Sequence, residues 1–230
     1  MLITELSTLQ EKLQTRFGDD ITAAMIHADQ LTIEIPSEKV LEICSALCDE
    51  ADFQFNQLID VCGVDYLSYG VSEWETESTT TTGFDRGVET GIEHKINWTK
   101  PRFAVVYHLL STLQNQRLRV RAFLDENNLL IDSVIKIWPV ANWFEREAFD
   151  LYGILFKGHP DLRRILTDYG FVGHPFRKDF PLSGHVEVRY DAEKKRVVYE
   201  PVDIEPRVLV PKVIRQDNRY QAPVPLPPKT

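Results

Sequence analysis

Apolar residues recur every three or four positions in two stretches of the first fifty residues. The stretch between Leu2 and Phe17 is followed by Gly18, so it predicts an amphipathic helix that ends there. In the second stretch, Ser37 is the predicted N-cap and apolar positions from 40 to 51 form the buried stripe. Two helices are therefore expected to cover one layer of the fold.

Five other stretches have the short apolar or alternating patterns of β-strands, at residues 21–27, 31–35, 55–64, 103–110 and 117–124. The stretch 103–110 is apolar on both faces and predicts a strand inside a sheet, whereas 117–124 alternates apolar residues with arginines. The resulting order is α-β-β-α-β-β-β. It predicts an α+β fold in which two helices lie on a mixed, largely antiparallel sheet.

A third helical pattern lies in "NWFEREAFDLYG", residues 142–153. Its apolar stripe at about 100° per residue consists of Val140, Phe144, Ala148 and Leu151. Glu147 falls beside this stripe, next to Trp143. We therefore expect Glu147 to be buried, where a carboxylate either takes part in chemistry or requires a partner that neutralises it.

Two regions lack such patterns. Residues 71–99 are rich in Glu and Asp and predict an acidic loop inserted in a core domain of residues 1–153. After Gly153, glycines and prolines interrupt the chain up to "APVPLPPKT" at its end. Residues 154–230 are therefore expected to form a long extended docking arm that becomes ordered on another protein.

Charge and composition narrow the class of protein. The 230 residues carry a net charge of −9, which argues against nucleic acid as a partner. The three cysteines are too few for a disulfide framework and indicate a reducing compartment. No apolar run is long enough to span a membrane, and the N-terminus resembles neither a signal nor a transit peptide.

The sequence gives little support for a site that binds a metal or a cofactor. Cys44 and Cys48 share a helix face, but Cys62 is the one remaining thiol, whereas structural zinc and iron–sulfur sites take four ligands. Phosphate-binding, dinucleotide-binding and H-E-x-x-H motifs are missing from the sequence. We therefore expect the chain to bind no cofactor or metal of its own.

Two histidine–proline turns, "KGHPDLRRIL" and "VGHPFRKDF", leave two interpretations open. His159 or His174 could act with Glu147 or Glu145 as the acid–base pair of a free-standing enzyme. Alternatively, each histidine hydrogen-bonds a nearby carbonyl in a glycine–proline turn. The second interpretation is preferred because the sequence supplies neither a nucleophile nor a third metal ligand at a readable spacing.

Charged residues of both signs follow one another from the third helix into the arm. We predict a docking network that orients helix, loops and partner and has no catalytic role; its members are Glu145, Arg146, Glu147, Asp150, His159, Arg163, Arg164, Arg177, Lys178 and Asp179. Removing one member of a buried network costs about 3–5 kcal/mol. Glu147 is expected to pair with an arginine of the following loops or of a partner.

Several of these residues belong to stretches that resemble the signature of a known family. Glu145-Arg146-Glu147, Asp150-Leu151-Tyr152-Gly153, "FKGHPDLRRIL" and "GHPFRKDFPLSGHVEVRYD" closely resemble the signature of the C subunit of bacterial NADH-quinone oxidoreductase, the thirty-kilodalton subunit family of respiratory complex I. The strongest match covers residues 139–191. The order of elements before it also agrees with the family domain.

The resemblance implies a peripheral-arm subunit without a cofactor, next to the D subunit and near the subunits that carry the last iron–sulfur centres. Other subunits of the complex pass electrons from NADH through FMN and Fe-S clusters to quinone, coupled to proton translocation. The expected location is the cytoplasmic side of the bacterial inner membrane, as a peripheral part of a hetero-oligomer. The equivalent subunit of a membrane-bound hydrogenase or of a ferredoxin-using complex is the alternative.

Overall fold

The computed structural model describes residues 3–76, 88–95 and 98–204. In these residues the helices are α1 (Ile3–Phe17), α2 (Val40–Asp49) and α3 (Ala141–Tyr152), with the 3-10 turns η1 (Gly18–Asp20) and η2 (Ser37–Lys39). The strands are β1 (Ala23–His27), β2 (Gln30–Ile35), β3 (Gln57–Asp65), β4 (Val71–Thr76), β5 (Val88–Lys95), β6 (Phe103–Ser111), β7 (Gln116–Leu124), β8 (Leu130–Asp132), β9 (Leu155–Lys157), β10 (Val186–Asp191) and β11 (Arg196–Pro201).

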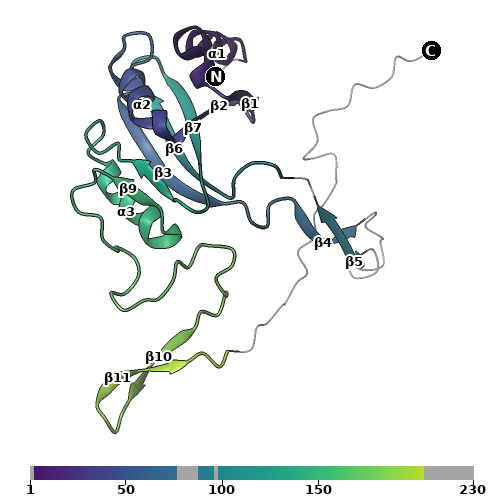
Figure 1. The fold of residues 1–230 in the computed structure, drawn as a ribbon, viewed down its shortest axis with the longest axis vertical. Coiled ribbons are helices and arrows are strands. Elements are labelled where there is room, and N and C mark those ends of the chain that lie inside the picture. Colours follow the sequence, from purple (N-terminus) through teal and green to yellow (C-terminus); the bar gives the residue numbers. More distant parts are fainter. Residues whose placement is uncertain (1–2, 77–87, 96–97, 205–230) are drawn as a thin grey trace. The chain divides into compact units, whose positions relative to one another are not determined.

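The main sheet has the strand order β1-β2-β7-β6-β3 (Figure 1). Only the β2–β7 pair in it is parallel, so the predicted α+β fold with a mixed, largely antiparallel sheet is confirmed. The turn between β1 and β2 places Ala28 and Asp29 at φ of 49° and 55°. Such left-handed residues are typical of a two-residue hairpin turn, which brings β1 back antiparallel to β2.

The hydrophobic core lies on one face of this sheet. Alternate residues of β6, from Phe103 through Tyr107 to Leu109, are 0–3% exposed and belong to the same cluster as Leu9 of α1 and Ile43 of α2. The cluster also includes Ala141 and Ala148, so α3 packs on the same core as the two earlier helices. At about 25 cal/mol per Å², burial of apolar surface in this core is the main favourable contribution to folding.

Each end of the second helix departs from the sequence prediction in one respect. Ser37 is not the N-cap of α2, because residues 37–39 form a 3-10 turn and Ser37 makes no capping hydrogen bond. Its hydroxyl instead donates to the carboxylate of Glu38 at 3.1 Å. Ala51, expected at the end of the buried stripe, lies beyond the helix and is exposed.

The chain divides into two compact units. The first consists of residues 1–67 and 100–200, so residues directly after α3 belong with the core. The second includes β4 and β5, which pair antiparallel within the stretch that was expected to be an acidic loop. Threonine, valine and isoleucine favour strands, which is a physical reason for a hairpin here. The domain boundary at residue 153 stays a prediction, and residues 77–87 and 205–230 lie outside the described residues.

After α3 the chain returns to the core through β9, which pairs in parallel with β8. The helix itself packs against β3, the edge strand of the main sheet. A Cβ atom on Gly63 of β3 would lie 2.6 Å from the ring of Tyr152, so only glycine permits this approach. This contact fixes the C-terminal end of α3, where the candidate site begins.

Candidate functional site: the end of helix α3 and the segment that follows

Helix α3 ends at Gly153, which adopts a left-handed conformation with φ of 77°. The Gly153 N–H donates to the carbonyl oxygen of Phe149 at 2.8 Å. A Cβ atom at this position would lie 2.5 Å from Nη2 of Arg177 and 2.7 Å from Nε2 of His174. Glycine therefore serves two purposes here, since it closes the helix and lets residues 174–177 pack against its end.

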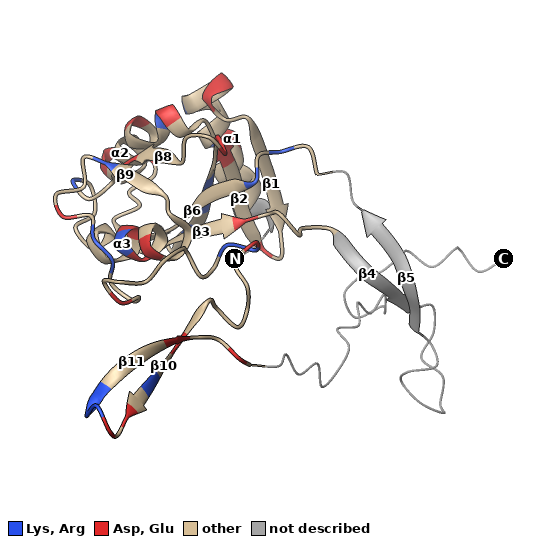
Figure 2. Cartoon of the chain, turned by 60° about the horizontal axis from the view of Figure 1, so that its bottom comes forward, with Lys and Arg blue, Asp and Glu red and all other residues tan. Residues whose placement is uncertain are grey.

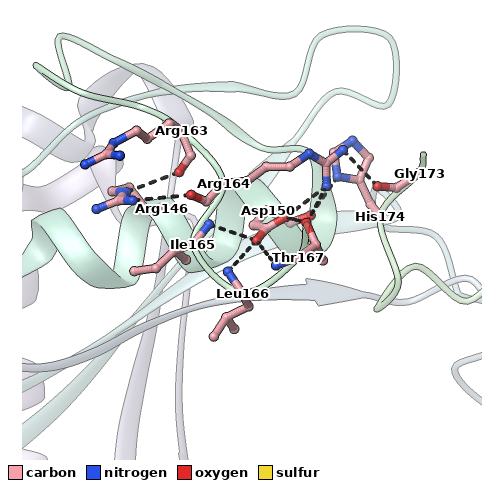
Figure 3. Close-up of polar contacts among 9 residues, drawn as sticks. All are labelled: Arg146, Asp150, Arg163, Arg164, Ile165, Leu166, Thr167, Gly173 and His174. Atoms are coloured by element: carbon pink, nitrogen blue, oxygen red, sulfur yellow. Dashed lines mark hydrogen bonds and ion pairs between the residues drawn. The ribbon is translucent and has the colours of Figure 1, made fainter. Parts of the chain in front are cut away.

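Asp150 is the centre of the polar contacts, and its side chain is 0% exposed (Figure 3). Its carboxylate accepts the backbone N–H groups of Ile165, Leu166 and Thr167 at 3.0, 2.7 and 2.8 Å. It also pairs with Arg164 Nη1 at 2.9 Å and accepts the Thr167 hydroxyl. Burial raises the pKa of Asp150, but the Thr167 hydroxyl and the three N–H groups outweigh it and lower the pKa far below the usual value.

Two arginines bind carbonyl oxygens of residues 163–173, the stretch whose backbone N–H groups Asp150 accepts (Figure 3). Arg146 donates from Nε to the carbonyl of Arg163 at 3.2 Å and from Nη2 to the carbonyl of Arg164 at 3.3 Å. Arg164 in turn donates from Nη2 to the carbonyl of Gly173 at 3.1 Å. Because a guanidinium has five N–H donors in a fixed plane, each arginine satisfies backbone groups that lie outside helices and sheets.

A second set of contacts joins residues 177–179 to the sheet and to the last residue of α3. Asp65 pairs with Arg102 at 2.7 Å and accepts the backbone N–H of Lys178 at 2.8 Å. Arg102 also lies 3.1 Å from Asp179, and Arg177 donates to the carbonyl of Tyr152 at 2.7 Å. Burial raises the pKa of Asp65, but the hydrogen bonds from Arg102 and from backbone N–H groups lower it below the ordinary value.

Both histidines contact backbone groups. His159 lies 3.3 Å from the carbonyl of Asn142 through Nε2 and accepts the N–H of Asp161 on Nδ1 at 3.1 Å. His174 Nδ1 lies 2.8 Å from the carbonyl of Asp150, and burial lowers its pKa, so the neutral ring donates its proton to that carbonyl. The prediction that each histidine hydrogen-bonds a nearby carbonyl is therefore confirmed.

The prediction that Glu147 is buried is wrong, because Glu147 is exposed and Glu145 is the buried carboxylate at 0%. Glu145 accepts the Ser133 hydroxyl at 2.6 Å and the N–H of Val134 at 2.8 Å. Burial raises the pKa of Glu145 to about 7, against the lowering effect of these two donors. The apolar stripe located the buried face only in part. Ala148 and Leu151 are buried, but Val140 is 44% exposed, and the helix turns Glu145 toward the donors of residues 133 and 134.

The expected pairing within the network is also only partly present. Arg164 joins Asp150, but the exposed Arg163 pairs with Asp161 at 2.9 Å, two residues away. In the described part of the chain, no arginine of the following loop forms an ion pair with Glu147. The prediction that Glu147 pairs with an arginine of the following loops is therefore wrong, because these arginines instead bind closer carboxylates and carbonyl oxygens.

Sequence reasoning missed four members of the site. They are Asp65, Arg102, Ser133 and Thr167. Asp65 and Arg102 had a readable signal, since they stand at adjoining ends of two predicted strands that pair antiparallel. Ser133 and Thr167 had none, because each lies in irregular chain between elements.

The contacts bind the segment 159–179 to α3 and β3, so these groups have a structural role in holding irregular backbone. Figure 2 shows charges of both signs on α3 and in the loop after β9. Among the described residues, no three His, Cys, Asp or Glu side chains gather as metal ligands. Burial raises the pKa of Cys62 to about 11 and that of the Cys44 thiol further, so neither is a reactive thiolate.

Comparison with known proteins decides the family. Residues 33–186 match the family described as the 30 kDa subunit of respiratory-chain NADH dehydrogenase, and this range is well over half of the 230 residues. The chain belongs to this family. The resemblance in the residues around α3 is thereby confirmed, and so is the function as a subunit of a respiratory NADH dehydrogenase.

Relatives within the 30 kDa subunit family cover nearly the whole chain. The C subunit of NADH-quinone oxidoreductase from Coxiella burnetii (strain RSA 493 / Nine Mile phase I) is 59% identical over 95% of this chain and 97% of its own length. The protein of the same name from Legionella pneumophila (strain Corby) is 59% identical over 95% and 96%. Membership in a multi-subunit oxidoreductase therefore replaces the alternative of a free-standing acid–base enzyme.

A solved structure shares the fold. A chain of the membrane-bound sulfane sulfur reductase, an archaeal respiratory membrane complex, aligns with a TM-score of 0.52 and 16% identity over 76% of this chain and 85% of its own. At that identity the likeness concerns the fold alone. Within the residues that the structure describes, no helix is both long and apolar enough to cross a membrane.

Proposed function

We propose that this chain is a docking and assembly subunit in the peripheral arm of NADH-quinone oxidoreductase and binds none of the redox cofactors. NADH, FMN, the iron–sulfur clusters and quinone belong to other subunits in this proposal. The chain lies next to the D subunit and near the subunits with the last iron–sulfur centres. It is a peripheral protein on the cytoplasmic side of the inner membrane.

One observation supports this proposal above the others. The signature side chains of α3, Arg146 and Asp150, hold irregular backbone in one conformation. The segment so held then presents apolar side chains to solvent, with Tyr169 92% and Val172 81% exposed. Exposed apolar residues on rigid backbone are characteristic of a protein–protein interface.

The test separates assembly from catalysis. In cells whose own copy is replaced, we expect Tyr169→Ser and Val172→Ser to lower the amount of assembled complex several-fold. The turnover of NADH and quinone by each assembled complex stays within about twofold, because no reacting group is changed. Fully assembled but slow complexes would contradict the docking role.

Leu113→Ser serves as the matched control. Leu113 is 71% exposed in the turn between β6 and β7, outside the segment that α3 holds. Its replacement therefore measures the effect of removing one exposed apolar side chain elsewhere on the chain. The amount of complex with Leu113→Ser is expected to exceed that with Tyr169→Ser.

A further inference from the structure

One face of α3 carries large side chains that no described element covers. Val140, Trp143 and Glu147 are three and four positions apart and so share a face of the helix. Val140 is 44% and Trp143 62% exposed, and Glu147 is exposed too. A tryptophan this open on a regular helix is unusual for a chain that acts alone, since tryptophan is mostly buried.

Trp143 is fixed in place although it is exposed. The guanidinium of Arg146 lies 5.6 Å from the centroid of its ring. Arg146 is itself only 8% exposed and is held by the carbonyl oxygens of Arg163 and Arg164. The indole is therefore preorganised, which reduces the entropy that binding a partner would cost.

Beside Glu147 lies a cavity of about 110 Å³ between α3 and the edge strand β3. Its walls include Asp60 and Cys62 of β3, Glu147 and Tyr152 of α3, and Phe176. The rings of Tyr152 and Phe176 meet edge to face at 5.9 Å between centroids. The lining holds two carboxylates and no lysine or arginine. Asp60 also lines a neighbouring hollow with Arg117 and Arg119 of β7, so the Glu147 side of the cavity is the one that favours a cation.

The arginines that follow Glu147 in the sequence are engaged with other groups. Arg163 and Arg164 pair with aspartates, and Arg177 donates to a carbonyl oxygen. Among the described residues, Glu147 thus forms no ion pair and lies at the rim of an acidic cavity with aromatic walls. A guanidinium fits this chemistry best, because it binds a carboxylate through two parallel hydrogen bonds and stacks on aromatic rings.

We propose that this face of α3 docks a neighbouring subunit through an arginine side chain, which enters the cavity between Glu147 and Asp60 while an apolar surface covers Trp143. We refer to Val140, Trp143, Glu147 and the adjoining cavity as the α3 docking face. The inference rests on the proposed docking function and names one contact through which it is achieved. Tryptophan and arginine are among the residues that most often dominate interface energies.

The test uses the assembled complex with Glu147→Gln and Glu147→Arg. Glu147→Gln keeps the shape and removes the charge, and Glu147→Arg repels a guanidinium. Glu126→Gln, an exposed carboxylate in the turn after β7, is the matched control. The isolated variant chains should unfold at the urea concentration of the parent, which shows that the fold is intact.

The measurement is the amount of chain retained on the complex as sodium chloride is raised. We expect Glu147→Gln to weaken retention about tenfold and Glu147→Arg to weaken it further, as when one charged hydrogen-bonded pair is lost. Glu126→Gln should retain the parental profile. Unchanged profiles for both Glu147 variants would overturn the proposal.

Free arginine hydrochloride then identifies the cation. At equal ionic strength it should release the parental chain at a lower concentration than lysine hydrochloride does, and this difference should vanish in Glu147→Gln. Equal effects of the two amino acids on the parent would reject arginine as the bound group. If Tyr169→Ser lowers assembly while all Glu147 variants behave as the parent, the docking function stands and the α3 docking face is not the interface.

Discussion

Two carboxylates on the same helix differ in charge state because different groups surround them. Asp150 and Glu145 are both 0% exposed. Asp150 receives three backbone N–H groups, a hydroxyl and a guanidinium, whereas Glu145 receives one hydroxyl and one N–H. Desolvation acts on both, so the number and charge of the donors determine which carboxylate stays ionised.

The raised pKa of Glu145 predicts a pH-dependent stability. The folded state binds the proton more tightly than the unfolded one, so the stabilisation is complete below pH 4.5 and is lost as the pH rises through about 7. At about 1.4 kcal/mol per unit, this loss amounts to roughly 3 kcal/mol. Urea unfolding of the full chain at pH 5 and pH 8 should show it, and Glu145→Gln should remove most of the difference.

Asp150 predicts a large cost of neutralisation. In Asp150→Asn an amide NH₂ group would face N–H donors, and we expect about 3–5 kcal/mol loss in the free energy of unfolding. Asp161→Asn removes an equally charged partner of an arginine at the surface and should cost about 0–1 kcal/mol. Urea midpoints at pH 7 measure both. Similar losses for the two variants would show that the donors around Asp150 contribute little.

At the scale of elements, α3 meets several other parts of the unit at its C-terminal end. There the helix packs on β3 at Gly63, closes at Gly153 and receives the following segment through Asp150. Strands of the main sheet, by contrast, are held by backbone pairing along their whole length. A change at this end of α3 should therefore disturb the segment 159–179 before it disturbs the sheet.

Alanine variants of two glycines with similar backbone conformations can separate the cost of backbone strain from the cost of overpacking. Gly153 and Gly158 have φ of 77° and 87°, but of the two only Gly153 has other atoms within 3 Å of an added Cβ. We expect Gly158→Ala to cost about 1 kcal/mol from the left-handed backbone alone. Gly153→Ala should cost about 1–3 kcal/mol more through overpacking. Hydrogen exchange should then show faster exchange at Leu166 and Thr167 in Gly153→Ala, and equal exchange in both variants would contradict this.

On the scale of the whole molecule, the chain combines a conventional core with a segment that buries little of its own apolar surface. Between residues 165 and 182, the side chains of Tyr169, Val172 and Leu182 are at least 81% exposed. Hydrogen bonds from the backbone of residues 165 and 166 to Asp150 nevertheless hold the first part of this stretch. Such a surface is expected to aggregate in a free protein and to be covered in an assembled one.

Chymotrypsin tests this at Tyr169, which is 92% exposed in the chain alone. We expect rapid cleavage after Tyr169 in the isolated chain and at least about tenfold slower cleavage in the assembled complex, because a covered site is not accessible to the protease. Tyr107, which is 0% exposed, should be cleaved in neither. The fragments, identified by mass spectrometry, would contradict the docking surface if Tyr169 were cut equally fast in both samples.

The sequence by itself determined the three helices, the five strands of the main sheet, their order and the family, but not β4, β5 or β8 to β11. Helix α1, the hairpin of β1 and β2, and the alternating strand β7 follow from periodicity, because each pattern is a local consequence of one face being buried. The residues from Glu145 to Gly153 carried the family signature in the same way. These features depend on residues close together in the chain, which a sequence shows directly.

Only the tertiary structure decided which charges are buried and what they bind. At about 100° per residue, Glu145 and Glu147 lie about 160° apart around the helix, so one of them can face the core, but periodicity selected the wrong one. The choice depended on Ser133 and Val134, whose donors belong to a different segment. Likewise the arginines of residues 146–177 bind carbonyl oxygens and nearby acids, because partners are chosen by distance in space.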